Sequence, residues 1–229
     1  MSSIKENEIL DIYNDNFEHI GTAGRKEVHE KGLWHQVVAC QTFNPETKKI
    51  IFQKKGGINC PYSKLDVTVG GHYRAGEKPE DCVREIREEL NENVNYEDLI
   101  PLGIRQCAAT VSNINQVINE FHRVFLLPMV KELEDYTLNG GEVAALVEID
   151  IEDTLNILLN RVGSIKGRIL FLEDGKQKIK TIDIEVDDFQ ECWRIKDEFL
   201  LGLTIACKRV VEGEDKKFVR CLALRTKAM

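Results

Sequence analysis

The sequence predicts an α/β protein, in which a mixed β-sheet lies between helices and a C-terminal hairpin and helix extend this core. Two observations predict the class. Several short apolar segments typical of strands flank an amphipathic helical segment at residues 79–91. Further along, residues 168–186 have the pattern of a β-hairpin around Asp174-Gly175, and residues 189–213 have the pattern of a long helix.

The length of the chain fits one elaborated domain. It has 229 residues, of which 42% are apolar, so it can bury a sizeable core. We expect a single domain over residues 1–229, with its core at about 8–161 and an elaboration at 162–229. No linker rich in Pro, Gly or Ser separates the two parts.

The remaining elements follow from local patterns. Residues 17–36 contain a turn and a short helical or irregular segment, and residues 56–64 form a loop with breakers at both ends. Residues 151–161 start with acidic residues and continue as an apolar helix. Strands are expected at residues 8–14, 36–43, 50–55, 65–69, 99–111, 118–130 and 143–149.

Residues 65–91 are the most informative stretch of the chain. Leu65, Val67 and Val69 alternate with polar residues, which is typical of a half-buried strand. We expect Gly70-Gly71 to end that strand, because two glycines allow backbone angles that a side chain forbids. The helix that follows begins near Pro79, whose missing N–H suits the first helical position.

This helix has an acidic face. Glu85, Glu88 and Glu89 are helical neighbours, because residues three and four apart lie on the same face. Like charges in this arrangement repel one another, and a bound Mg²⁺ removes that repulsion while bridging to substrate phosphates. Arg84 lies four residues before Glu88 and is placed to hold its carboxylate. The alternative is an acidic helix face that is simply solvated.

The stretch resembles the signature of the Nudix family. The matching residues are Gly71, Glu77, Arg84, Glu85, Ile86, Glu88 and Glu89. Six residues, and not seven, separate Glu77 from Arg84, while Asn91 stands where the signature has Gly and Glu92 where it has an apolar residue. The missing residue puts the role of Glu77 in doubt, since one residue rotates a helix by about 100°.

The resemblance implies a Nudix fold and a Mg²⁺-dependent hydrolase, with Mn²⁺ as a possible substitute. Such an enzyme cleaves a diphosphate bond in a nucleoside diphosphate linked to another group. The implied metal ligands are Glu85, Glu88 and Glu89. The implied catalytic residues are Arg84 and, as general base, a box glutamate such as Glu88 or the loop residue Glu142, for which an exposed loop acid is the alternative. The candidate substrate-binding residues are Gly71, His72, Arg105 and Glu120.

The chain also resembles isopentenyl-diphosphate isomerase, a relative of the Nudix hydrolases. In that enzyme paired histidines, a histidine after the glycine turn and a Glu-x-Glu on a later strand form a metal site. The corresponding residues here are His29, His35, His72 and Glu120, with Ile118 in place of the first Glu. Gly70 occupies the position of the catalytic cysteine, which argues against isomerase activity. A Nudix-fold binding protein without turnover is a further alternative.

Composition limits the partners. A net charge of −8 argues against a nucleic-acid polymer or an anionic membrane as the main partner. Seven scattered cysteines suit a reducing compartment, so we expect a cytoplasmic protein with a small-molecule diphosphate substrate. The large apolar residues of the elaboration must be buried, so we expect this segment to pack on the core and to border the substrate cleft or a homodimer interface. These residues are Phe189, Trp193, Phe199, Leu203 and Val210.

Overall fold

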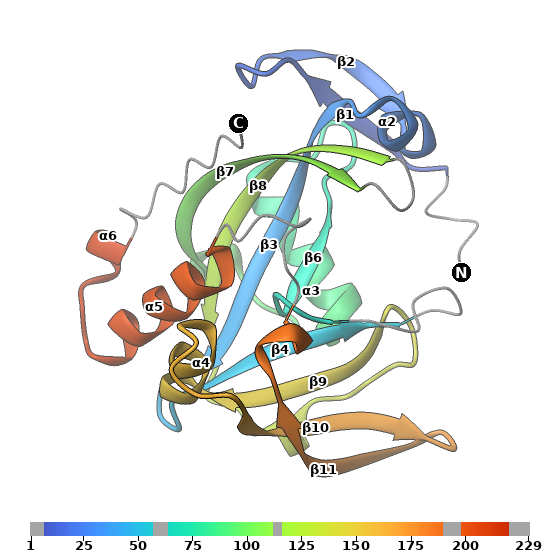
Figure 1. Ribbon diagram of the computed structural model, residues 1–229. Helices are drawn as coiled ribbons and strands as arrows, with labels where there is room; N and C mark the ends of the chain where they lie inside the picture. The colour runs from blue at the N-terminus through green and yellow to red at the C-terminus, as the bar shows by residue number, and fades with distance from the viewer. Residues whose placement is uncertain (1–6, 57–63, 112–115, 190–197, 220–229) are drawn as a thin grey trace.

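The computed structural model describes residues 7–56, 64–111, 116–189 and 198–219. One mixed sheet of 11 strands runs through this part of the chain, with helices on both of its faces (Figure 1). The main strand order is β11-β10-β9-β4-β3-β1-β2, while β8 and β6 also pair with β3, β7 pairs with β8 and β5 pairs with β4. This architecture confirms the predicted fold class.

The N-terminal part contains one strand that the sequence did not predict. β1 (Ile9–Tyr13) lies within the expected segment, and α2 (Arg25–Lys31) supplies the expected helix. Between them, β2 (His19–Gly24) pairs antiparallel with β1. Its sequence contains two glycines and an alanine, which have low strand propensity, so the pairing with β1 fixes its conformation.

β3 (Trp34–Asn44) is the central strand of the site. It runs parallel to β8 (Gln116–Pro128) and antiparallel to β6 (Val69–His72) and β4 (Lys49–Lys55). Alternate residues of a strand point to opposite faces, so Val38 and Ala39 mark the two sides of the sheet. Figure 1 shows α3 behind this strand and α5 in front of it.

The stretch around the glycine pair differs from the expectation. The strand expected at 65–69 consists of two pieces, β5 (Leu65–Asp66) and β6, and Gly70-Gly71 lie inside β6 instead of ending a strand. Gly70 is paired with Ala39 and Gly71 with Val38. The two glycines therefore face opposite sides of the sheet, and their backbone is held by the ladder with β3.

The acidic helix begins with a tighter turn. A 3₁₀ helix, η1 (Pro79–Cys82), precedes the α-helix α3 (Val83–Leu90), which ends at Asn91 in the left-handed conformation with φ 58°. A 3₁₀ turn has about 3.0 residues where an α turn has 3.6, so the lead-in is compatible with a segment that is one residue short. Asn91 stands where the family signature has Gly, and Asn is one of the residues that tolerate this left-handed cap conformation.

The second half of the sheet follows the prediction closely. β7 (Ile100–Val111) and β9 (Val143–Asp150) lie within a residue of the expected strands, and α4 (Ile151–Leu158) begins after an N-cap by Asp150. β10 (Ile165–Glu173) and β11 (Lys176–Ile184) form the hairpin predicted around Asp174-Gly175. Both turn residues have positive φ, 51° and 72°, which suits the right-handed twist of a hairpin.

The C-terminal helix begins later than in the sequence prediction, which was a helix over residues 189–213. α5 (Phe199–Val211) begins at Phe199, whereas Phe189 follows the short helix η4 (Val186–Asp188) and stacks edge-on against Phe52 of the core. Trp193 lies outside the described residues. α6 (Lys216–Val219) is a single turn at the end of the described chain.

The elaboration is packed on the core of the sheet. Phe199 and Leu203 of α5 share one buried cluster with Ala39 and Val124, while Val38 shares another cluster with residues of α3. α5 and α3 therefore cover opposite faces of β3. This burial accounts for the apolar content of α5 within one chain, and a homodimer stays a prediction.

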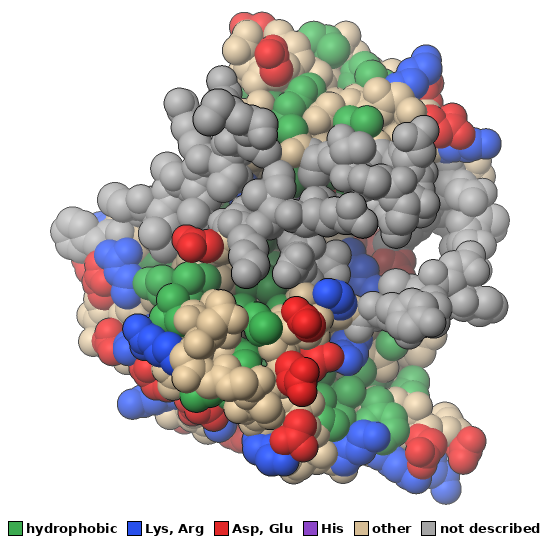
Figure 2. Space-filling model, viewed as in Figure 1, with side chains coloured by type: hydrophobic (Ala, Val, Ile, Leu, Met, Phe, Trp, Pro, Cys, Tyr) green, Lys and Arg blue, Asp and Glu red, His purple; other side chains and the backbone are tan. Residues whose placement is uncertain are grey.

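The surface carries mixed charge. On the face shown in Figure 2, Lys and Arg side chains are interspersed with Asp and Glu over the lower half. None of the described helices is long and apolar enough to cross a membrane.

Candidate active site

Gly71 and Glu85 are in close contact where β6 passes over α3. A Cβ atom at position 71 would lie 2.2–2.6 Å from the carboxylate atoms of Glu85, so any side chain there would displace that carboxylate. The side chain of Glu85 is 4% exposed. The backbone of β6 at Gly71 thus packs directly against the Glu85 carboxylate.

Glu89 lies beside Glu85 and is held by two donors. The backbone N–H of Gly70 donates to its Oε2 at 2.9 Å, and the amide of Gln53 donates to the same atom at 3.2 Å. Burial raises the pKa of Glu89 to about 7, an effect that Lys55 and the Gly70 N–H oppose and the nearby Glu85 increases. A bound cation would stabilise the ionised form of this buried carboxylate, because it would replace the hydration that burial removes.

Arg84 connects the box helix to the loop before it. Its Nη1 donates to Glu85 Oε1 at 2.7 Å and its Nη2 donates to the carbonyl of His72 at 3.0 Å. Its Nε and Nη2 also donate to the two carboxylate oxygens of Glu77, at 2.7 and 2.9 Å. The short spacing between Glu77 and Arg84 therefore leaves their ion pair intact.

Glu88 has a different environment from the other two box glutamates. Its side chain is 38% exposed and lies 3.3 Å from Arg84 and 3.5 Å from Arg74. Glu85 and Glu89 point under β6, whereas Glu88 points outward. The three glutamates were expected to share one face of the helix, but only Glu85 and Glu89 form a buried pair, and Glu88 is exposed to solvent.

The buried pair fits the divalent cation that the fold family implies. Mg²⁺ takes carboxylate oxygens as ligands and retains several waters. Glu85 and Glu89 supply the carboxylates, and the glycine at position 71 leaves room for the Glu85 carboxylate against the backbone of β6. Glu88 and Glu142 are the nearby acids suited to proton transfer.

Lys55 stands at the junction of the two sides of the sheet. It is the last residue of β4, and its Nζ would lie 3.9 Å from a Cβ at Gly70. Lys55 is exposed at the end of its strand, and the loss of hydration that its surroundings impose would by itself lower the pKa of its ammonium group. Four carboxylates nevertheless raise that pKa, namely those of Asp66, Glu89, Glu120 and Glu142. The lysine therefore stays charged among the acids on both sides of β6.

A second cluster of possible metal ligands lies on the side of the sheet that faces α5. Ring nitrogens of His29, His35 and His72 lie within 4.8 Å of one another. His35 Nδ1 donates to the carbonyl of Leu33 at 2.8 Å, which leaves its Nε2 as an acceptor. Among the described residues, His35 Nε2, His29 Nδ1 and His72 Nε2 have no hydrogen-bond partner.

The electrostatics of the histidine cluster favour a bound cation. Burial lowers the pKa values of all three histidines, that of His29 to about 4, so that the rings are neutral, the form that binds metals. Glu120 Oε1 lies 3.7 Å from His35 Nε2. Imidazole nitrogens with one carboxylate suit Zn²⁺ or another transition metal better than Mg²⁺.

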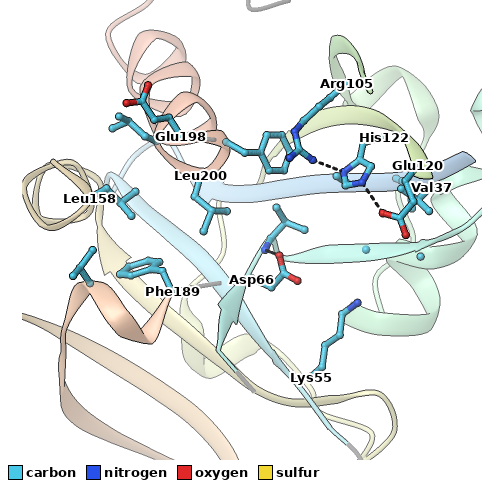
Figure 3. Close-up of a pocket in the computed structure, with 18 of the residues that line it drawn as sticks. Val37, Lys55, Asp66, Arg105, Glu120, His122, Leu158, Phe189, Glu198 and Leu200 are labelled. Carbon is cyan, nitrogen blue, oxygen red and sulfur yellow. Dashed lines mark hydrogen bonds and ion pairs between the residues drawn. The ribbon is translucent and has the colours of Figure 1, made fainter. Parts of the chain in front are cut away.

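Glu120 belongs to a partly buried row of polar groups. His122 Nε2 donates to Glu120 Oε2 at 2.8 Å, and Arg105 Nη1 donates to His122 Nδ1 at 3.2 Å (Figure 3). Burial would raise the pKa of Glu120, but the hydrogen bond from His122 and the nearby histidines lower it to about 2. The guanidinium of Arg105 lies 4.4 Å from the ring centre of Phe199 on α5.

Arg105, Glu120, His122 and Phe199 line a cavity with a volume of about 440 Å³. Of the candidate substrate-binding residues, Gly71, His72, Arg105 and Glu120 all line it. Five other candidates do not line it: Arg84, Glu85, Glu88 and Glu89 belong to α3 on the opposite face of β3, and Glu142 precedes β9 beside Gly56. The structure therefore brings the candidates together in two adjoining groups.

Sequence reasoning missed two contributors to the site. Gln53, which binds Glu89, and Asp66, which acts on Lys55, lie on strands on either side of the loop at 56–64. Their polar character within apolar strands was the available signal. None of the described cysteines lines the cavity, so the position held by Gly70 has no substitute thiol among the described residues.

Comparison with known proteins adds the following. The family model described as NUDIX domain matches residues 33–170. An uncharacterized Nudix hydrolase of Clostridium acetobutylicum is 35% identical over 189 residues, which cover 80% of this chain and 90% of that protein. An uncharacterized Nudix hydrolase of Nostoc is 36% identical over 98 residues, 42% of this chain and 58% of that protein. A Deinococcus radiodurans protein of known crystal structure aligns with a TM-score of 0.49 and 22% identity, over 67% of this chain and 90% of that chain.

Proposed function

Since this chain belongs to the Nudix hydrolase family, we propose that it is a Mg²⁺-dependent hydrolase of a diphosphate bond. The substrate in this proposal is a nucleoside diphosphate linked to another group, and Mn²⁺ substitutes for Mg²⁺. The observation that carries the proposal is the pair of buried carboxylates, Glu85 and Glu89, beneath the glycine pair of β6.

The reaction uses one water molecule. The oxygen of this water forms a bond to one phosphorus, the bridging P–O bond breaks, and the bridging oxygen leaves with the other phosphate. When bound, the divalent ion supplies positive charge that neutralises the diphosphate. Glu88 or Glu142 takes the proton of the water.

Arg84 positions the carboxylates in this scheme. It contacts Glu85, Glu88 and Glu77 as well as the backbone of His72, so it fixes the box helix relative to β6. Lys55 and Arg105 supply positive charge on the cavity side, where the substrate's phosphates meet Gly71, His72 and Glu120. Ordering of these groups before the reaction lowers its barrier.

The cysteines and two alternative functions also bear on the proposal. Four described cysteines are free and buried, namely Cys40, Cys82, Cys107 and Cys207, which supports a reducing, cytoplasmic compartment. The isomerase alternative lacks support because Gly70 provides no acid or base. A binding role without turnover is disfavoured because both buried carboxylates of the box are present.

The test is a panel of diphosphate compounds incubated with the protein and Mg²⁺, with the phosphate products identified. Hydrolysis that requires a divalent ion and falls roughly 10²-fold in Glu89→Gln supports the proposal. Lys64→Gln, a change of an exposed residue outside the site, serves as the matched control. Turnover that is equal with and without divalent ions contradicts the proposal.

A further inference from the structure

The cavity has two chemically different ends. Charged and polar side chains gather at the end near β6, namely Lys55, Asp66, His72, Arg105, Glu120 and His122. The other end lies against the C-terminal elaboration and α4, where most lining residues are apolar, namely Leu158, Leu159, Val186, Phe189, Phe199 and Leu200, while Asn160, Asp187 and Glu198 line the same end. In Figure 3, Leu158, Phe189 and Leu200 lie on one side of the cavity and Glu120 and His122 on the opposite side.

The polar end adjoins the proposed reaction centre. Gly70 lines the cavity, and its N–H donates to Glu89 on the other side of β6. Lys55 also lines the cavity and interacts with both Glu89 and Glu120. A diphosphate placed beside Gly70 therefore reaches Lys55 and directs its attached group into the cavity.

The floor of the cavity continues the apolar lining. Val37 and Ala39 on β3 point to this side, between the polar row and α5. Val37 and Ala39 offer no side-chain hydrogen bond, so a hydroxyl-rich group lying on this floor would lose hydration there without compensation from these two residues. The volume of about 440 Å³ lies in the range of small-molecule sites.

We propose that this cavity binds a hydrocarbon group attached to the substrate's diphosphate, and that Phe189 and Leu200 determine the size of that group. The inference rests on the proposed function and narrows it, since the group linked to the diphosphate is apolar. The C-terminal elaboration is then the element that sets substrate preference, because it supplies the apolar wall.

Binding of a graded series of ligands tests the inference. The ligands are non-hydrolysable methylene bisphosphonates that carry methyl, butyl or octyl esters, titrated calorimetrically into the full-length protein with Mg²⁺. We expect the dissociation constant to fall about threefold to fourfold for each added methylene until the cavity is filled, as burial of a CH₂ predicts. A dissociation constant that does not depend on chain length overturns the inference.

Two variants of α5 locate the effect. Leu200→Trp fills the cavity and should weaken the butyl ester at least tenfold while the methyl ester binds as before. Ile205→Trp makes the same kind of change at a 38% exposed position of the same helix, outside the cavity lining, and should leave the series unaltered. Equal losses for both esters, or equal effects of both variants, contradict the inference. The series on the unaltered protein decides the question even where Leu200→Trp does not fold.

The outcomes separate this inference from the proposed function. Chain-length-dependent binding together with no hydrolysis of any diphosphate retains the hydrocarbon site and refutes the hydrolase. Mg²⁺-dependent hydrolysis of diphosphates together with no effect of chain length retains the hydrolase and refutes the hydrocarbon site.

Discussion

The guanidinium of Arg84 forms two hydrogen bonds with the carboxylate of Glu77, at 2.7 and 2.9 Å, across a loop that is one residue shorter than the family signature. Glu77 Oε2 also accepts the backbone N–H of Arg74 at 2.7 Å. The 3₁₀ turn at Pro79–Cys82 precedes α3, and the pairing survives the shorter spacing. Glu77 thus fixes the loop that precedes the box helix.

Substitution of Glu77 tests this structural role. Glu77→Gln should lower the free energy of unfolding by about 1–3 kcal/mol, because it weakens charge-assisted hydrogen bonds that are partly buried. Glu80→Gln, at an exposed position in η1, is the matched control and should cost less than about 1 kcal/mol. Urea denaturation measures both, and equal losses would show that the Glu77 pair adds nothing specific.

The glycine pair gives a sharper comparison. Gly71→Ala places a Cβ within 2.6 Å of the Glu85 carboxylate, so that side chain must move and Mn²⁺ affinity should fall about tenfold or more. Gly70→Ala places its Cβ 3.6–3.9 Å from its neighbours and retains the N–H that binds Glu89, so the affinity should change little. Mn²⁺ titration followed by electron paramagnetic resonance measures this difference. Similar affinities in the two variants would argue that Glu85 is no ligand.

The histidine cluster predicts a second metal. The protein equilibrated with Zn²⁺ and then dialysed should retain about one equivalent by elemental analysis, since three neutral imidazoles and a carboxylate suit this ion. His72→Gln should lose it, whereas Glu85→Gln, which alters the other group of ligands, should retain it. Zinc retained in His72→Gln and lost in Glu85→Gln would reverse the assignment.

Packing of α5 on the core predicts a large effect on stability. Leu203→Ala removes a side chain that is 1% exposed and should cost about 2–5 kcal/mol. Ile205→Ala on the same helix, at 38% exposure, should cost much less. Thermal unfolding should show a fall in Tm of about 2–4 °C for each kcal/mol. A small fall for Leu203→Ala would indicate that α5 packs only loosely on the sheet.

Local chemistry allowed part of this structure to be predicted. The hairpin at Asp174-Gly175 and the acidic face of α3 follow from turn residues and helical spacing, which act over a few positions. The continuation of β6 through Gly70-Gly71 did not follow, because pairing with β3 overrides the low strand propensity of glycine.

Long-range pairing decided the rest of the site. His29 and His72 are far apart in the chain, and α2 and β6 bring both of them into contact with His35. The start of α5 at Phe199 could not be predicted from the sequence either, because the apolar pattern continues upstream to Phe189. Patterns along the sequence proposed the candidate residues, but tertiary packing decided which of them meet.

The central claim is that the buried pair Glu85 and Glu89 supports hydrolysis of a diphosphate by water. The most direct measurement is phosphorus NMR of a diphosphate substrate turned over with Mg²⁺ in ¹⁸O-labelled water. The account predicts ¹⁸O in one of the two phosphate products and a rate roughly 10²-fold lower in Glu89→Gln. Full activity of Glu89→Gln, or products without ¹⁸O, would contradict it.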